Sequence, residues 1–94
     1  METYPKKTTS QPKLTSMMNI GEKLEKRLNA VEIHTPEQLM ATGSKEAFFS
    51  LKQHDPSVCT VHLYALEGAV SGIEYNRLPE DVKQDLKNFS DTVK

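Results

Sequence analysis

The sequence has one cysteine, no tryptophan, four glycines and a formal net charge of only -1. Because Cys59 has no second cysteine to pair with, the fold cannot depend on an internal disulfide, and we expect an intracellular, cytoplasmic protein. No run approaches the ~20 apolar residues of a membrane-spanning helix. The polar N-terminus also lacks the apolar core of a signal peptide. We therefore expect no contact with a membrane.

The chain is too short for a multi-domain enzyme but long enough for one folded domain. Its 94 residues are 36% hydrophobic and 27% charged, which lies outside the low-apolar, high-charge range of disordered chains. A domain of this size must bury nearly all of its apolar residues to be stable. Little apolar surface is left for a deep pocket, so we expect no small-molecule substrate.

The patterns that carry catalysis or cofactor binding are also missing. Four glycines supply neither a glycine-rich phosphate loop nor a nucleophile elbow. Cys59 and His62 are spaced to share one face of a helix, but a tetrahedral zinc site needs three or four ligands. We expect Cys59 to be a buried hydrophobic residue and His62 to be a core histidine with a satisfied hydrogen bond. We predict no enzyme activity, no metal and no cofactor.

What the sequence does contain is helical periodicity, with apolar residues recurring every three or four positions. No segment alternates for long enough to form a strand. Signals for helix starts occur at Asn19, Thr35, Ser44, Asp55-Pro56 and Leu78-Pro79. The fold prediction is all-α: a compact bundle of five to six helices. We expect a short turn at 14–18 and helices near 20–31, 36–42, 45–54, 57–74 and 79–92.

Two parts of this chain differ from the rest. Residues 1–12 are rich in proline, threonine and lysine without periodicity, so we predict a flexible tail before a helical domain at 13–94. The segment 57–74 is apolar almost all round, which predicts the central buried helix of the bundle. A smooth flank on this helix consists of Ala65, Gly68, Ala69 and Gly72. We expect tight packing within one chain there, with a homodimer contact as the alternative.

The small net charge hides an uneven distribution. Residues 1–30 carry six Lys or Arg and three Glu, a net charge of +3, whereas residues 31–94 carry six Lys or Arg and ten Asp or Glu, a net charge of -4. Such a division can mark a surface for a polyanion. The basic part coincides with the one segment that could hold a phosphate.

That segment is a turn of Asn19, Ile20 and Gly21 between a short helix and an amphipathic one, the pattern of a helix-hairpin-helix. Gly21 has no side chain, so a phosphate could approach the free N–H groups of the following helix. The predicted nucleic-acid-binding residues are Asn19, Ile20, Gly21, Lys23, Lys26 and Arg27, which would contact phosphates without reading bases.

Two features oppose this interpretation: Asn19 stands where many such hairpins have glycine, and Glu22 places an acid beside the expected phosphate. The alternative is a turn that merely begins a helix and packs against its neighbours or another protein.

A resemblance to a known family supports the same fold. The segments that carry it are Leu14-Thr15-Ser16, Asn19 to Leu24, Ile33 to Leu39, Leu63-Tyr64-Ala65-Leu66-Glu67-Gly68-Ala69, Gly72-Ile73 and Leu78-Pro79. In this order they resemble the C-terminal domain of the TfoX (Sxy) family of bacterial competence regulators, over roughly residues 12–92.

The resemblance implies an all-α domain of helix-hairpin-helix character, in a stand-alone form without the N-terminal domain that family members usually have. Met17-Met18 stands where family members often have Leu-Pro. The function we expect is a small non-enzymatic regulatory domain with weak, sequence-independent nucleic-acid binding. The alternative is a protein-interaction module or homodimer without direct DNA contact.

Overall fold

The structure is a computed structural model that describes residues 13–93 of the chain. Over that range it contains five α-helices and two short 3₁₀ helices, and no strand. In chain order the elements are η2 (Leu14–Ser16), α1 (Glu22–Ala30), α2 (Pro36–Thr42), α3 (Ser44–His54), α4 (Thr60–Ser71), η3 (Tyr75–Arg77) and α5 (Glu80–Thr92). The all-α prediction is confirmed. The predicted flexible tail at 1–12 lies outside the described residues, as does Lys94.

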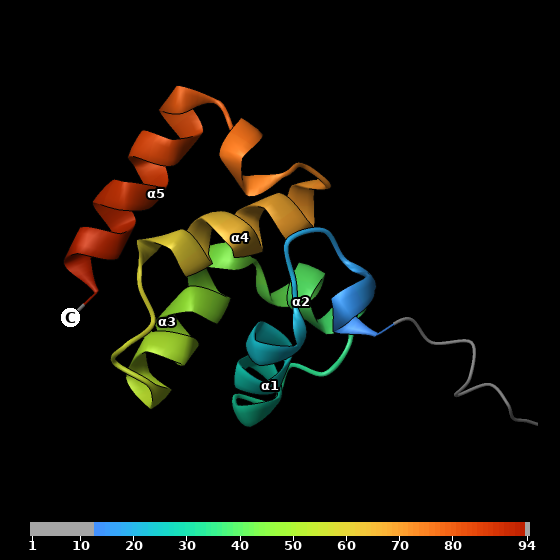
Figure 1. Ribbon diagram of the computed structural model, residues 1–94. Coiled ribbons are helices and arrows are strands. Elements are labelled where there is room, and N and C mark those ends of the chain that lie inside the picture. The colour runs from blue at the N-terminus through green and yellow to red at the C-terminus, as the bar shows by residue number, and fades with distance from the viewer. Residues whose placement is uncertain (1–12, 94) are drawn as a thin grey trace, which may run out of the picture.

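Helix α4 is the central element of the bundle. It lies between α5 on one side and the group formed by α1, α2 and α3 on the other (Figure 1), and it packs against α3, α5 and η3. Its buried residues are Leu63, Ala65, Leu66, Gly68 and Ala69. Because these positions surround most of the helix axis, α4 can contact elements on several sides, as the sequence predicted.

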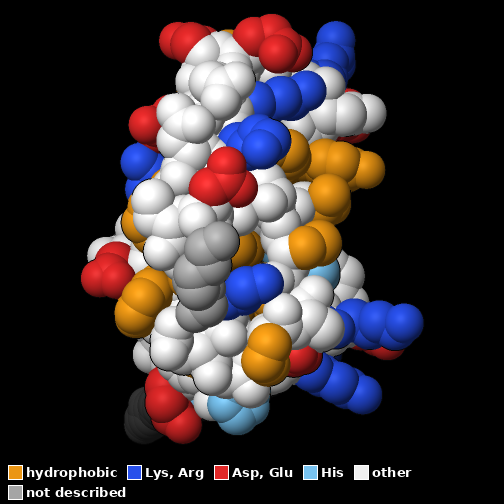
Figure 2. Space-filling model, turned by 90° about the vertical axis from the view of Figure 1, so that its left-hand side faces the viewer, with side chains coloured by type: hydrophobic (Ala, Val, Ile, Leu, Met, Phe, Trp, Pro, Cys, Tyr) orange, Lys and Arg blue, Asp and Glu red, His pale blue; other side chains and the backbone are white. Residues whose placement is uncertain are grey.

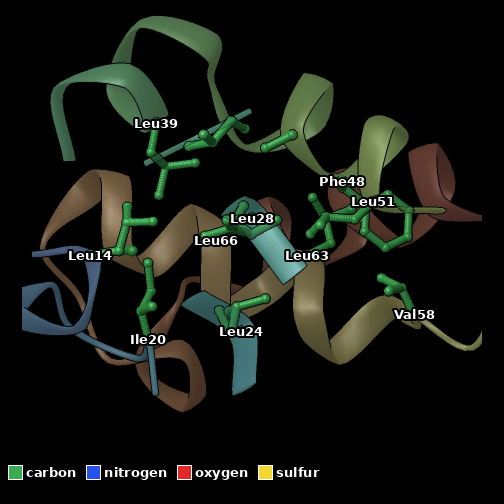
Figure 3. Close-up of a cluster of buried hydrophobic side chains, with 14 of the residues drawn as sticks. Leu14, Ile20, Leu24, Leu28, Leu39, Phe48, Leu51, Val58, Leu63 and Leu66 are labelled. Atoms are coloured by element: carbon green, nitrogen blue, oxygen red, sulfur yellow. The ribbon is translucent and has the colours of Figure 1, made fainter. Parts of the chain in front are cut away.

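The hydrophobic core draws leucine side chains from nearly every element. Leu14 from η2, Leu28 from α1 and Leu39 from α2 converge with residues of α3 and α4 (Figure 3), and all three are fully buried. In α3 and α5, the rings of Phe48 and Phe89 meet edge to face, with their centroids 6.4 Å apart. That geometry is the favoured one for aromatic pairs.

The predicted helix starts are correct at two sites. At α2, the Thr35 hydroxyl accepts a hydrogen bond from the Gln38 N–H at 3.1 Å, the expected N-cap contact. The Gln38 side chain adds a second contact at this end of the helix, because its Oε1 accepts from the His34 N–H at 2.7 Å. Helix α5 begins directly after Pro79, with Glu80 and Asp81 in its first turn.

Two other predicted caps are wrong. The side chain of Asn19 does not cap α1, because its amide bonds a different part of the chain and Gly21 is the N-cap. Ser44 does not cap α3 either: Gly43, at φ 87°, both ends α2 and begins α3. The Ser44 hydroxyl is buried and donates to Glu67 Oε1 at 2.6 Å instead. In both cases the side chain bonds a distant part of the chain instead of the first-turn N–H groups that a cap would bond.

The central helix is shorter than the predicted segment 57–74. Asp55 ends α3, and its carboxylate accepts from the Ser57 N–H at 3.0 Å, so Pro56 belongs to a turn and does not start a helix. At the other end, Gly72 adopts a left-handed conformation, φ 74° and ψ 32°, that terminates α4.

Cys59 and His62, the cysteine and the histidine of this segment, lie at the start of α4. Cys59 is the N-cap of α4 and is exposed, so the expectation of a buried cysteine is wrong. His62 is half-buried, and its Nδ1 accepts a hydrogen bond from the Cys59 N–H at 3.1 Å. The expected hydrogen bond of His62 is therefore present, but it belongs to a helix cap at the edge of the core.

Candidate nucleic-acid interface

A tight turn connects η2 to α1. The Ile20 N–H donates to the Met17 carbonyl oxygen at 3.3 Å, and Asn19, at the third position of the turn, has φ 73°. Glycine and asparagine are the residues that adopt a positive φ at this position most readily. The Asn19 that replaces a glycine of the usual pattern is therefore compatible with the hairpin. Ile20 is buried and anchors the turn in the core.

The side chain of Asn19 joins this turn to the far end of α4. Its Nδ2 donates to the Ile73 carbonyl oxygen at 2.9 Å and to that of Ala65 at 3.4 Å, while its Oδ1 accepts from the Tyr75 N–H at 3.1 Å. These bonds engage both the nitrogen and the oxygen of the side-chain amide. Asn19 therefore positions the turn, and its amide is not available for a phosphate while the bonds persist.

Beside it, the N-terminus of α1 is open. Gly21 is the N-cap, no side chain of residues 13–93 bonds the first-turn N–H groups, and a β-carbon at Gly21 would have no atom within 4 Å. Free N–H groups and the positive end of the helix dipole attract anions. Glu22 and Glu25 lie in this first turn and oppose that attraction.

The charged residues of α1 are only partly separated on its surface. At about 100° per residue, Lys23 and Arg27 lie on one side of the exposed face and the two glutamates lie on the other, with Lys26 between them, four residues after Glu22. Lys23 and Lys26 are exposed and form no ion pair with any residue in 13–93. We call the side formed by Lys23, Lys26 and Arg27 the basic edge of α1.

Arg27 forms an ion pair with a carboxylate outside α1. Its guanidinium lies 3.5 Å from the carboxylate of Asp55, which follows the last residue of α3. The hydroxyl and the N–H of Ser57 donate to this carboxylate, and with Arg27 nearby they lower the pKa of Asp55 below 3.8. Asp55 therefore stays ionised near neutral pH and offsets part of the charge on the basic edge. Sequence reasoning missed this partner, because no local pattern connects Asp55 with α1.

The predicted interaction flank of α4 is mostly covered by this chain. Ala65, Gly68 and Ala69 are buried, and only Gly72 is exposed. A β-carbon at Gly68 would clash with Asn19 Nδ2 and with the Ile73 carbonyl oxygen. The close backbone approach that the small residues predicted thus occurs within one chain. Binding of a partner at the flank stays a prediction.

These features can be compared with known proteins. A family model described as the TfoX C-terminal domain matches residues 10–90. The chain belongs to this TfoX family.

A curated relative of this TfoX domain is protein Sxy of Escherichia coli (strain K12). It is 30% identical over 84 residues, which are 89% of this chain but 40% of Sxy. The chain thus spans less than half the length of that relative. The helix-hairpin-helix detail stays a prediction, since the element before the hairpin is a single 3₁₀ turn.

Solved structures from Listeria monocytogenes share the TfoX domain fold. One, described as an uncharacterized protein in a triclinic form, is 46% identical with a TM-score of 0.84, and the match covers 86% of this chain and 92% of that one. Another, a protein of unknown function in a tetragonal form, is also 46% identical with a TM-score of 0.83, and the match covers 86% and 99%.

Other site types receive no support from the part of the TfoX domain that the structure describes. Within residues 13–93, no group of three or more His, Cys, Asp or Glu side chains is placed to hold a metal. None of the helices in that range is long and apolar enough to cross a bilayer. Figure 2 shows acidic, basic and hydrophobic side chains interspersed on the face that it presents, without a large field of one sign. Any attraction for a polyanion on that face is therefore local.

Proposed function

We propose that this TfoX domain is a non-enzymatic regulatory domain that binds the phosphate backbone of nucleic acid weakly and without sequence preference. The observation that carries the proposal is the pairing of an uncapped α1 N-terminus at Gly21 with the exposed Lys23 and Lys26. Backbone N–H groups and lysines contact phosphates without reading bases.

The charges on and beside α1 determine how strongly we expect the domain to bind DNA. Glu22 and Glu25 lie in the first turn of α1, and Asp55 pairs with Arg27, so α1 itself offers two or three cations for phosphates. With that many contacts, raising the salt concentration from about 50 to about 200 mM should weaken binding by roughly 10- to 40-fold. A domain of this kind would bind DNA appreciably only at low salt or next to a second contact.

The test is a titration of a short labelled DNA duplex, followed by fluorescence anisotropy at both salt concentrations. The variant Lys23→Glu with Lys26→Glu should abolish binding, because it reverses the exposed part of the basic edge. A matched control is Lys83→Glu with Lys87→Glu on α5, which makes the same change in net charge elsewhere. The control should reduce affinity only by its general electrostatic effect.

Two results would overturn the proposal. One is the absence of binding by the native protein at about 50 mM salt. The other is an equal loss of affinity in the α1 and α5 variants, which would mean that net charge alone, and no defined site, governs the attraction. A second duplex of unrelated sequence should bind with the same affinity, since no base contact is involved.

A further inference from the structure

An open groove of about 590 Å³ lies between the α2–α3 junction and helices α4 and α5, and none of its lining residues belongs to the basic edge. Its apolar lining comes from Val70 of α4 and from Val82 and Leu86 of α5. The two valines are half-buried and Leu86 is buried, so the valines present carbon surface to the groove. This volume falls in the range of protein clefts that bind small ligands.

The rim of the groove is acidic. The lining contains four carboxylates and one lysine, Lys45, which gives a net charge of -3. The carboxylates belong to Glu46, Glu67, Asp81 and Asp85. Lys45 Nζ is 2.8 Å from Asp85 Oδ2 and 5.6 Å from the centre of the Phe89 ring, so its charge is already engaged.

The remaining rim carboxylates differ in their availability. Glu67 is held by hydrogen bonds from the hydroxyls of Ser44 at 2.6 Å and Ser71 at 3.0 Å. Glu46 and Asp81 are exposed and pair with no cation in the described part of the chain. Two carboxylates therefore stand free at the edge of an apolar floor.

We propose that this groove binds a basic amphipathic helix of a partner protein. Apolar side chains of such a helix would cover Val70 and Val82, and its lysines or arginines would pair with Glu46 and Asp81. The negative rim repels nucleic acid and favours a cationic peptide over an acidic one. The inference does not rest on phosphate binding at α1, because the two surfaces share no residue.

The test uses a short, fluorescein-labelled helical peptide of leucine and lysine, and a twin in which glutamate replaces every lysine. The lysine peptide should bind at least about tenfold more tightly than the glutamate peptide, and its affinity should fall with salt. The variant Glu46→Lys with Asp81→Lys should weaken binding of the lysine peptide by about tenfold.

A matched control is Glu37→Lys with Glu80→Lys. It makes the same change in net charge, and both residues also lie in the first turn of a helix but outside the groove. Its affinity for the lysine peptide should stay within about twofold of the native value. Equal effects of the two double variants would overturn the assignment of the groove.

A measurement on the native protein keeps the proposal falsifiable even if the groove variant does not fold. In NMR titrations with the lysine peptide, the methyl signals of Val70, Val82 and Leu86 should shift first. Shifts confined to another surface, equal binding of the two peptides, or no binding up to about 1 mM would overturn it. Loss of DNA binding in the α1 variant with unchanged peptide binding would separate this inference from the proposed function.

Discussion

Asn19 and Gly68 fit together so closely that the amide of one occupies the space that a β-carbon on the other would need. Asn19 reaches this position because its turn has a positive φ, and it stays there through hydrogen bonds to Ile73 and Tyr75. The turn before α1 is thereby attached to the end of α4. This contact sets the position of the surface that the turn offers to a partner.

Gly68→Ala should destabilise the fold by about 2 kcal/mol, although alanine favours helices over glycine. The new methyl group would collide with Asn19 Nδ2 and with the backbone oxygen of Ile73, which cannot move away like the end of a flexible side chain. Urea denaturation followed by circular dichroism measures the change. Gly21→Ala is the control, because open space surrounds that position, and the weaker N-cap preference of alanine should cost no more than about 1 kcal/mol. Equal stabilities of the two variants would contradict the close contact.

Asn19→Ala should cost about 2–3 kcal/mol of unfolding free energy, because it removes the bonds to Ile73 and Tyr75 and places alanine at a positive φ. Asn19→Gly avoids the strain of alanine at a positive φ and should therefore destabilise the fold by about 1 kcal/mol less than Asn19→Ala. The difference in unfolding free energy between these variants, measured by urea denaturation, gives the cost of that strain. If alanine and glycine were equally destabilising, the positive φ of Asn19 would have no energetic role.

His62 should make the fold less stable in mild acid. Burial, and then the Arg27 guanidinium, lower the pKa of His62 below 6.5 in the folded state, so the unfolded chain binds a proton more readily. Stability is therefore full above pH 6.5 and decreases as the pH falls through the window between 6.5 and the lowered folded pKa. Protonation at Nδ1 would also remove the acceptor for the Cys59 N–H.

The control for this pH dependence is His62→Gln. Glutamine is a capping-box residue that can accept the same N–H bond but does not titrate. Its unfolding free energy, measured in urea at several pH values, should stay flatter than that of the native protein between about pH 5 and 7. Parallel curves for the two proteins would show that other groups cause the dependence.

Cys59 should react with a thiol reagent in the folded protein. Its side chain is exposed at the start of α4, so labelling by dithionitrobenzoate does not require unfolding. The rate in buffer should lie within about tenfold of the rate in denaturant. The reaction is followed by absorbance on the one thiol of the chain. A rate that tracks the global unfolding equilibrium would instead place the thiol in the core.

The sequence alone determined which segments are helical. Apolar spacing and the Thr35-Pro36 signal are local properties, so the predicted helix at 36–42 coincides with α2. The ends of α4 could not be predicted from the sequence, because they depend on which residue caps the helix. The Asp55 carboxylate accepts a hydrogen bond from the Ser57 N–H, and Cys59 is the N-cap, with its N–H bonded to His62. Such choices between neighbouring hydrogen-bond partners are settled by the packing around them.

The candidate sites also combine features that are local in the sequence with features that depend on tertiary contacts. The sequence alone determined that a basic segment follows a turn with Asn19 and Gly21, and that small residues line one flank of the central helix. Only the tertiary structure decided that Asn19 fills the flank at Gly68, that Asp55 pairs with Arg27, and that acids from α3, α4 and α5 surround one groove. The physical reason is that each of these contacts joins residues far apart in the chain, and only the packing of the helices sets their distances.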